Sequence, residues 1–291
     1  MHTDTQPTPA ITVAFPPAAA VGAAAPAQIE DRVLSILGVR VVDTTRPRAA
    51  RLLTELLRAR DGRSRTVFFV NAHTLNLAVS VAGYRDILNA SDYTFADGTG
   101  VRWAARLAGA RLQDNVNGTD LLPELFRTVG RQPALAGGHR CFLLGADEPT
   151  LRRAAAFVES SLGRWTVCGW HHGYLADGRL TAEVLRRIAA GRPDVLLVGM
   201  GNPLQEQWIH AHRRQLDVPL VIGVGGLLNF WSGNVPRAPA WLRRWGAEWL
   251  WVLCQQPHKA RRYLAGNPLF LARVLGDWWR RTQKTPGKPG R

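Results

Sequence analysis

Two polar side chains, an amide and a carboxylate, follow short apolar runs and could take part in the same chemistry. Asn71 comes directly after the run Thr66–Val70, and Asp97 comes directly after Tyr93–Ala96. In an open sheet of parallel strands, ligands bind at the carboxyl ends of the strands, and we expect Asn71 and Asp97 to be on neighbouring strand ends that the sheet brings together. A carboxylate there can remove a proton from an attacking hydroxyl, and an amide can orient the substrate. An Asp-Gly pair is also a common turn, and Asn71 could equally cap the helix expected after it.

Two glycine-rich loops are candidates for binding an anion. Gly199-Met-Gly-Asn-Pro-Leu-Gln-Glu206 follows one predicted strand and leads into a helix, and Gly223-Val-Gly-Gly226 follows the next strand. A helix N-terminus offers free backbone N–H groups and a favourable dipole, so a diphosphate is a natural occupant. Neither loop completes G-x-G-x-x-G, because Leu204 and Leu228 replace the third glycine, which disfavours a dinucleotide dehydrogenase. Tight strand-to-helix turns alone would also explain these glycines.

Several other chemistries lack their motifs. The sequence contains no G-x-S-x-G elbow, no phosphate-binding G-x-x-x-x-G-K-[ST] loop and no D-x-D pair of the kind that chelates a metal in many nucleotide-sugar enzymes. His210 and His212 are two residues apart on a predicted helix and therefore point to different faces. His171 and His172 are adjacent and diverge if that segment is extended. We therefore expect no bound metal and no cofactor.

The elements that must position these residues alternate between strand and helix. Apolar, β-rich segments predict strands at Val33–Val42, Thr66–Val70, Tyr93–Ala96, Arg140–Gly145, Trp165–Gly169, Asp194–Gly199 and Pro219–Gly223. Amphipathic patterns and caps predict helices at Ala49–Arg60, Thr74–Val81, Thr99–Ala108, Thr119–Val129, Glu148–Leu162, Thr181–Ala190 and Pro203–Gln215. This alternation predicts an α/β fold with a Rossmann-like, mostly parallel sheet and helices on both faces.

Positive charge and tryptophan are concentrated at the C-terminal end. The 291 residues include 37 Lys and Arg against 22 Asp and Glu, a net charge of +15, which favours an anionic partner. Residues 237–291 carry +10 of this charge and six of the eleven tryptophans. Trp241, Trp245 and Trp249 are four residues apart and share one helical face beside Arg243 and Arg244. Such a face suits the headgroup level of a bilayer, although it could instead pack on the core.

The remaining composition divides the chain into four parts. Residues 1–30 are rich in Ala and Pro and contain no Lys or Arg, which predicts a disordered tail and not a secretory signal. We expect an α/β core at 31–235, a helical, basic, Trp-rich appendage at 236–282 that associates with membranes, and a disordered basic tail at 283–291. No apolar run is long enough to span a bilayer. No motif of a nucleic-acid-binding fold accompanies the charge, so nucleic acid is not an expected partner. The three cysteines are expected to be reduced core residues.

A series of motifs, in order, resembles one known family. They are Asn71, Ala96-Asp-Gly-Thr-Gly-Val101, Asn117-Gly-Thr-Asp120, Gly199-Met-Gly-Asn-Pro-Leu-Gln-Glu-Gln-Trp208, Gly223-Val-Gly-Gly226, Ser232-Gly, Arg237-Ala-Pro-x-Trp241 and Glu248-Trp-Leu250. The chain resembles the WecG/TagA/CpsF glycosyltransferases, glycosyltransferase family 26, over about residues 34–266. Its Gln-Glu-Gln-Trp208 and Gln256–Tyr263 stretches are most similar to the exopolysaccharide-assembly branch.

The resemblance implies an inverting, metal-independent transferase at the inner face of the bacterial cytoplasmic membrane. It would move a sugar from a UDP-sugar, with UDP-glucose slightly ahead of UDP-N-acetylmannosamine, onto a polyprenyl-diphosphate-linked sugar. Its expected partners are this donor and acceptor, the anionic membrane surface and, from its relatives, further copies of itself. A non-catalytic, membrane-bound scaffold of a polysaccharide assembly complex is the alternative.

The resemblance also assigns roles to residues. The family's proposed base falls on Asp97, its pocket amide on Asn71 and its motif glutamine on Gln205, which could otherwise be solvated. Cations for the diphosphate would be Lys259 and Arg262, with Arg261 as a neighbour that could substitute, unless these residues form a solvated face or contact lipid. The other residues expected to bind substrate are Thr99, Asn117, Thr119, Asp120, Gly199, Gly201, Asn202, Gly225 and Gly226.

Three positions depart from the family pattern. Phe69 stands where relatives often carry threonine, Val252 where an arginine is common, and Asn229 where aspartate is frequent. These changes put individual pocket contacts in question and could indicate a different donor or acceptor. We expect specificity to differ from that of the relatives chiefly at Phe69.

Overall fold

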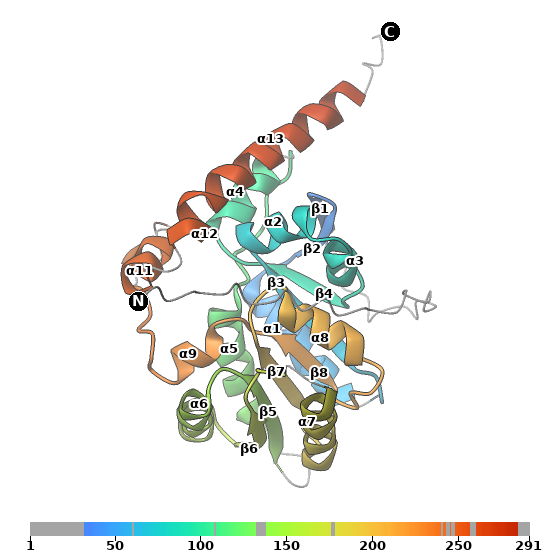
Figure 1. Cartoon of the computed structure of the whole chain (residues 1–291), viewed down its shortest axis with the longest axis vertical. Coiled ribbons are helices and arrows are strands. Elements are labelled where there is room, and N and C mark those ends of the chain that lie inside the picture. The colour runs from blue at the N-terminus through green and yellow to red at the C-terminus, as the bar shows by residue number, and fades with distance from the viewer. Residues whose placement is uncertain are drawn as a thin grey trace, which may run out of the picture.

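The computed structural model describes residues 32–59, 61–107, 109–131, 138–175, 178–239, 241–242, 245, 248–256 and 260–284. Within them the chain forms a single eight-stranded sheet covered by helices on both faces (Figure 1). The strands are β1 (Arg32–Ile36), β2 (Val39–Asp43), β3 (Arg65–Val70), β4 (Tyr93–Ala96), β5 (His139–Gly145), β6 (Trp165–His171), β7 (Val195–Gly199) and β8 (Leu220–Gly223). The predicted tail at 1–30 lies outside the described residues.

The sheet is parallel apart from one hairpin. Its order is β1-β2-β4-β3-β8-β7-β5-β6, and only β1 and β2 pair in the antiparallel sense. The stretch Val33–Val42, predicted as one β-rich segment, is this hairpin. Leu37 and Gly38 both have positive φ, 51° and 79°, which is the geometry of a tight two-residue hairpin turn. The mostly parallel α/β fold predicted from the sequence is confirmed.

Helices fill the connections between the strands and continue beyond the sheet. They are α1 (Arg46–Ala59), α2 (Ala72–Ser80), α3 (Tyr84–Asn89), α4 (Thr99–Leu107), α5 (Gly118–Gly130), α6 (Glu148–Ser161), α7 (Gly178–Gly191), α8 (Leu204–His212), α9 (Leu227–Trp231), α11 (Glu248–Gln255), α12 (Ala260–Leu264) and α13 (Gly266–Lys284). The short helices α3 and α9 were not predicted. Each is six residues or fewer, too short to show a clear helical period.

The two faces of the sheet have separate cores. Apolar side chains of α1, α5, α6 and α9 pack on one face, and those of α2, α3, α4, α7, α8 and α13 pack on the other. The helices that follow the neighbouring strands β3 and β8 therefore lie on opposite faces of the sheet: α2 follows β3 and α9 follows β8. A crevice at the carboxyl ends of two such strands is the usual ligand site of a doubly wound sheet.

The long helix α13 is attached to the core by its first half. Phe270 and Val274 are buried in the second core, Nδ2 of Asn76 donates to the carbonyl of Gly266 at 2.7 Å, and Arg273 donates to the carbonyl of Asn76 at 2.7 Å. The second half of α13 extends away from the sheet (Figure 1). Among the described residues, no helix is long and apolar enough to cross a membrane. The helix also takes in residues 283 and 284, which were assigned to the basic tail.

Candidate functional site

Asn71 and Asp97 lie side by side at the carboxyl edge of the sheet. Val70 pairs in register with Ala96, so the residue after each strand comes to the same place, and the backbone N–H of Asp97 donates to the carbonyl of Val70 at 2.9 Å. Asp97 is half-buried. The prediction that the sheet brings Asn71 and Asp97 together on neighbouring strand ends is confirmed, and Thr99 opens α4 two residues beyond Asp97.

The side chain of Asn71 caps helix α2. Its Oδ1 accepts from the backbone N–H groups of His73 and Thr74 at 3.0 and 3.1 Å, and from the hydroxyl of Thr74 at 3.2 Å. The capping interpretation therefore holds for this oxygen. Binding of substrate by Asn71 stays a prediction.

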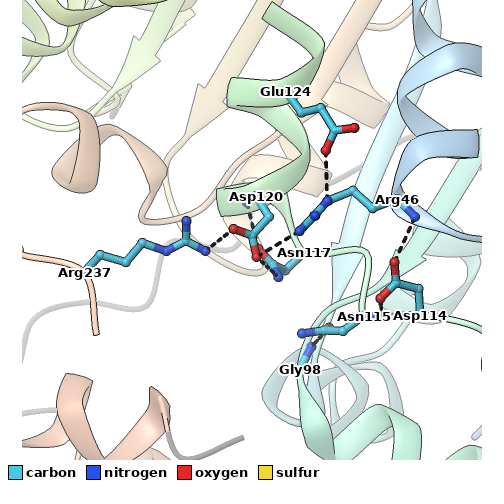
Figure 2. Close-up of polar contacts among 8 residues, drawn as sticks. All are labelled: Arg46, Gly98, Asp114, Asn115, Asn117, Asp120, Glu124 and Arg237. Atoms are coloured by element: carbon cyan, nitrogen blue, oxygen red, sulfur yellow. Dashed lines mark hydrogen bonds and ion pairs between the residues drawn. The ribbon is translucent and has the colours of Figure 1, made fainter. Parts of the chain in front are cut away.

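The turn that contains Asp97 and Gly98 is hydrogen-bonded to a separate loop, around Asn115, that the sequence analysis did not identify. The N–H of Gly98 donates to Oδ1 of Asn115 at 2.6 Å, and Gly98 has a φ of 98° that a residue with a side chain would adopt at a cost (Figure 2). Two hydrogen bonds hold the loop that contains Asn115. The N–H of Arg46 donates to Asp114 at 3.1 Å, and the N–H of Gln113 donates to Asp43 at 2.7 Å. Asn115 is 17 residues from Gly98, so no local motif could have revealed the contact.

Asp120, predicted to bind substrate, lies between two arginines (Figure 2). Its carboxylate contacts Arg237 at 2.5 Å and Arg46 at 3.7 Å, and it accepts from Nδ2 of Asn117 at 2.9 Å. Burial alone would raise the pKa of Asp120, but the Asn117 hydrogen bond and the charges of Arg237 and Arg46 outweigh it, and the pKa is below its ordinary value. Asp120 therefore anchors the segment that leads from α9 toward the appendage.

Two neighbours of Asp120 have local roles at the start of α5. Asn117 is the N-cap, and its Oδ1 accepts from the N–H of Asp120 at 2.8 Å. Thr119 is half-buried in the first turn. Phe69 is buried behind them: a Cβ added to Gly118 would lie 3.0 Å from its ring. Contact of Asn117, Thr119 or Asp120 with substrate, and a role for Phe69 in specificity, stay predictions.

The two glycine loops are in close contact and share Gln205. A Cβ added to Gly199 would lie 3.0 Å from the carbonyl oxygen of Gly225, so a side chain at this position would crowd the second loop. The N–H of Gly225 donates to Oε1 of Gln205 at 2.9 Å, and Gln205 is buried, which rules out the solvated interpretation. The N–H of Gly225 is thus engaged within the protein. Binding of a diphosphate by Gly199, Gly201 or Gly226 stays a prediction.

A fully buried carboxylate, Glu206, lies beneath these loops. It accepts from Nδ2 of Asn202 at 2.6 Å, from Nε2 of Gln205 at 2.7 Å and from the hydroxyl of Tyr84 at 2.9 Å. Burial raises the pKa of Glu206, although the hydrogen bonds from Gln205, Tyr84 and Asn202 oppose the shift. Burial and the nearby Glu206 raise the pKa of Tyr84 far above its usual value. The sequence motif contained Glu206, but only its complete burial distinguishes it from an ordinary surface glutamate of a first helical turn.

None of the three cations expected to bind the diphosphate has a side chain within the description. Lys259 lies outside the described residues, and Arg261 and Arg262 belong to α12 but their side chains are outside the description. Diphosphate binding by these three stays a prediction. In the described part of the chain, no group of three or more His, Cys, Asp or Glu residues is placed to hold a metal ion, and metal independence also stays a prediction. The cysteines are free, as expected, but Cys254 is exposed and is not a core residue.

Comparison with known proteins identifies the family. The model of the "Glycosyl transferase WecG/TagA/CpsF family" matches residues 34–284, and so includes α13. A Bacillus subtilis (strain 168) protein named N-acetylglucosaminyldiphosphoundecaprenol N-acetyl-beta-D-mannosaminyltransferase is 32% identical over 208 residues, which cover 72% of this chain and 78% of that protein. A Staphylococcus aureus (strain MW2) protein of the same name is 28% identical over 241 residues, 83% of this chain and 91% of that protein. The chain therefore belongs to the WecG/TagA/CpsF family and is a glycosyltransferase.

Proposed function

We propose that this glycosyltransferase moves a sugar from a UDP-sugar onto a sugar linked to a polyprenyl diphosphate, with inversion at the anomeric carbon. The observation that carries the proposal is the position of Asp97, a half-buried carboxylate next to Asn71 at the carboxyl edge of a doubly wound sheet. Support for the acceptor comes from the relatives, whose names specify an N-acetylglucosaminyldiphosphoundecaprenol acceptor.

The proposed reaction needs one base and a place for the leaving group. The acceptor hydroxyl attacks the anomeric carbon from the side opposite the UDP group, its proton passes to the Asp97 carboxylate, and UDP leaves with the bonding electrons of the broken C–O bond. The crevice between β3 and β8, bordered by the loop Gly223–Gly226, would hold the UDP group. Cations from the appendage, Lys259 with Arg261 or Arg262, would balance its charge in place of a metal.

Two lines of support favour two different donor sugars. Resemblance to the exopolysaccharide-assembly branch favours UDP-glucose, whereas the names of the relatives in Bacillus subtilis and Staphylococcus aureus favour N-acetylmannosamine. The identity between this chain and those relatives, 32% and 28%, leaves room for a different sugar pocket. Both donors therefore belong in the first assay, and synthesis of exopolysaccharide is the proposed setting if glucose is transferred.

We also propose that the appendage docks on the anionic inner surface of the cell membrane. On α13 the apolar residues Leu275 and Trp279 are exposed on the side opposite the buried Phe270, and Leu269 is also exposed. Trp241 and Trp245 are also exposed, and their rings contact each other edge to face at a centroid distance of 6.0 Å. Trp249 and the flanking Arg243 and Arg244 were part of the predicted stripe, but their side chains lie outside the description.

A transfer assay tests the enzymatic proposal. Purified protein is mixed with a short-chain polyprenyl diphosphate carrying N-acetylglucosamine, and with UDP-glucose, UDP-N-acetylmannosamine, UDP-N-acetylglucosamine or UDP-galactose in separate reactions. Mass spectrometry of the lipid product should show one added hexose or N-acetylhexosamine from a single preferred donor, and the new linkage should have the opposite anomeric configuration to the donor. Hydrolysis of every donor without transfer, or transfer with retention, would contradict the proposal.

A further inference from the structure

The buried carboxylate of Glu206 connects three separate segments of the chain, around residues 84, 202–206 and 225. Tyr84 comes from α3, Asn202 from the loop after β7, and Gln205 from the first turn of α8; Gln205 in turn holds the N–H of Gly225 in the loop after β8. Glu206 has no exposed surface, and Tyr84 has none either. A carboxylate in such a place is stable only because donors fill its lone pairs.

The contacts of Glu206 decide which way the amide of Gln205 faces. Nε2 of Gln205 donates to Oε1 of Glu206 at 2.7 Å, so Oε1 of Gln205 is turned toward the N–H of Gly225, 2.9 Å away. If Glu206 did not accept this bond, the amide of Gln205 would lose its preferred orientation. The loop after β8 would then lose the hydrogen bond that holds it against the loop after β7.

Because the two loops are closely packed, the orientation of the Gln205 amide affects the positions of both loops. Gly199 and Gly225 approach so closely that a Cβ on Gly199 would lie 3.0 Å from the carbonyl oxygen of Gly225, and a Cβ on Gly223 would lie 3.1 Å from Nε2 of Gln205. Asn202 in the first loop is bonded to the same oxygen of Glu206 as Gln205. A shift of Glu206 would therefore move both loops together.

We propose that Glu206 is a positioning residue that fixes the loops Gly199–Asn202 and Gly223–Gly226 relative to each other, and that the ligand whose site depends on this spacing is the diphosphate of the nucleotide-sugar donor. The inference rests on the proposed function for the identity of that ligand. Glu206 itself is buried beneath the loops and contacts no substrate. Its substitution should therefore weaken donor binding and leave acceptor binding unchanged.

The direct test compares Glu206→Gln with the matched variant Glu148→Gln, which removes an exposed glutamate from the first turn of α6. Asn202 and Gln205 donate to one oxygen of Glu206 and Tyr84 to the other. Glutamine has one acceptor oxygen and an NH2 group that cannot accept, so either Tyr84 or the pair Asn202 and Gln205 loses its acceptor. We expect the KM for the donor, and the Kd for UDP measured by calorimetry, to rise about tenfold, while the acceptor KM and kcat stay within about twofold. Glu148→Gln should match the wild type in all four values.

Hydrogen exchange provides a test that needs no substrate. In Glu206→Gln, the amide of Gly225 and the loop peptides at 199–202 and 223–226 should exchange faster than in the wild type, while peptides from β5 and α6 should exchange at the wild-type rate. If Glu206→Gln does not fold, Tyr84→Phe removes one donor to Glu206 without altering the loops directly. It should raise the Kd for UDP about threefold and speed exchange at Gly225.

The outcomes separate this inference from the proposed function. Wild-type protein that binds UDP but transfers no sugar would refute the proposed reaction, while the effect of Glu206→Gln on UDP binding and on Gly225 exchange would still decide the inference. A folded Glu206→Gln protein with wild-type Kd for UDP and wild-type exchange at Gly225 would overturn the inference, as would a wild-type protein that binds no UDP. A fall in kcat together with equal rises in the KM for donor and the KM for acceptor would also overturn it, because these changes indicate general damage to the fold.

Discussion

Two carboxylates at the carboxyl edge of the sheet, Asp97 and Glu206, differ in burial, and this difference separates their proposed roles. Asp97 is half-buried in a turn after β4, beside the strand end that carries Asn71. Glu206 is fully buried and accepts three hydrogen bonds from protein groups. The partial exposure of Asp97 supports its proposed contact with a substrate hydroxyl, whereas Glu206 has no exposed surface and can only organise the residues around it. The sequence predicted the place of Asp97 from the strand before it but gave no sign of the burial of Glu206.

The raised pKa of Glu206 predicts a pH-dependent stability. Because burial raises the pKa above the ordinary value of 4.5, the folded state binds this proton more tightly than the unfolded state does. The contribution of Glu206 to stability is therefore full below about pH 4.5 and is lost as the pH rises through the folded-state pKa. Glutamine does not titrate, so the free energy of unfolding of Glu206→Gln relative to wild type should improve as the pH rises across this range.

Urea denaturation of the two proteins at a series of pH values checks this expectation, with Glu148→Gln as the control for loss of a carboxylate. Groups that both proteins share cancel in the difference, which isolates position 206. A difference in unfolding free energy that stays constant with pH, or that changes in favour of the wild type as the pH rises, would show that Glu206 is not the buried acid described here.

At the scale of elements, the two helices that follow the site residues are supported by α13, a helix of the C-terminal appendage. A Cβ placed on Gly100 in α4 would lie 3.4 Å from Cβ of Ala72 in α2 and 3.6 Å from the ring of Phe270 in α13. Phe270 therefore packs behind the first turns of α2 and α4, the helices that follow Asn71 and Asp97. The sequence predicted α2 and α4 nearly to the residue, but the docking of α13 on them is a long-range contact that periodicity cannot reveal.

This packing predicts that Phe270→Ala affects both stability and activity. Phe270 is 1% exposed, and truncating a buried phenylalanine costs about 3 to 4 kcal/mol of unfolding free energy. Because the first turns of α2 and α4 lose their support, kcat should also fall. Leu269→Ala, at the exposed neighbour on the same helix, is the matched control and should change stability by less than about 0.5 kcal/mol. Denaturation and steady-state kinetics would measure both effects, and a Phe270→Ala protein as stable as Leu269→Ala would refute this account of the packing.

On the scale of the whole molecule, the chain combines a doubly wound sheet with a basic, Trp-rich appendage. The alternation of strands and helices apart from α3, α9 and the β1–β2 hairpin, the side-by-side position of Asn71 and Asp97, and the family were predicted from local patterns and motifs. The contacts of Asp120 with Arg46 and Arg237 were not, because the three residues are separated by 74 and 117 positions and meet only through the fold. Asp120 was expected to bind substrate, and in the structure it fastens the start of the appendage segment to the core.

The exposed apolar side of α13 predicts how the molecule meets a membrane. Replacing Leu275 and Trp279 together with glutamate puts two negative charges on this side and should abolish sedimentation with vesicles that contain anionic lipid. The control is Tyr174→Glu, an exposed aromatic residue that follows β6, which is the edge strand at the opposite end of the sheet from β1. Retained binding by the Leu275→Glu/Trp279→Glu protein would show that another surface docks, and stronger salt-dependent binding to DNA than to anionic vesicles would favour a nucleic acid as partner.

The role of Asp97 is the central claim, and the rate of sugar transfer by Asp97→Asn tests it most directly. The substitution keeps the shape of the side chain but removes the base, so with saturating UDP-sugar and lipid-diphosphate acceptor kcat should fall about a hundredfold or more. The Kd for UDP, measured by calorimetry on the same protein, should stay at the wild-type value, because Asp97 is proposed to act on the acceptor hydroxyl. Undiminished transfer by Asp97→Asn would contradict the account.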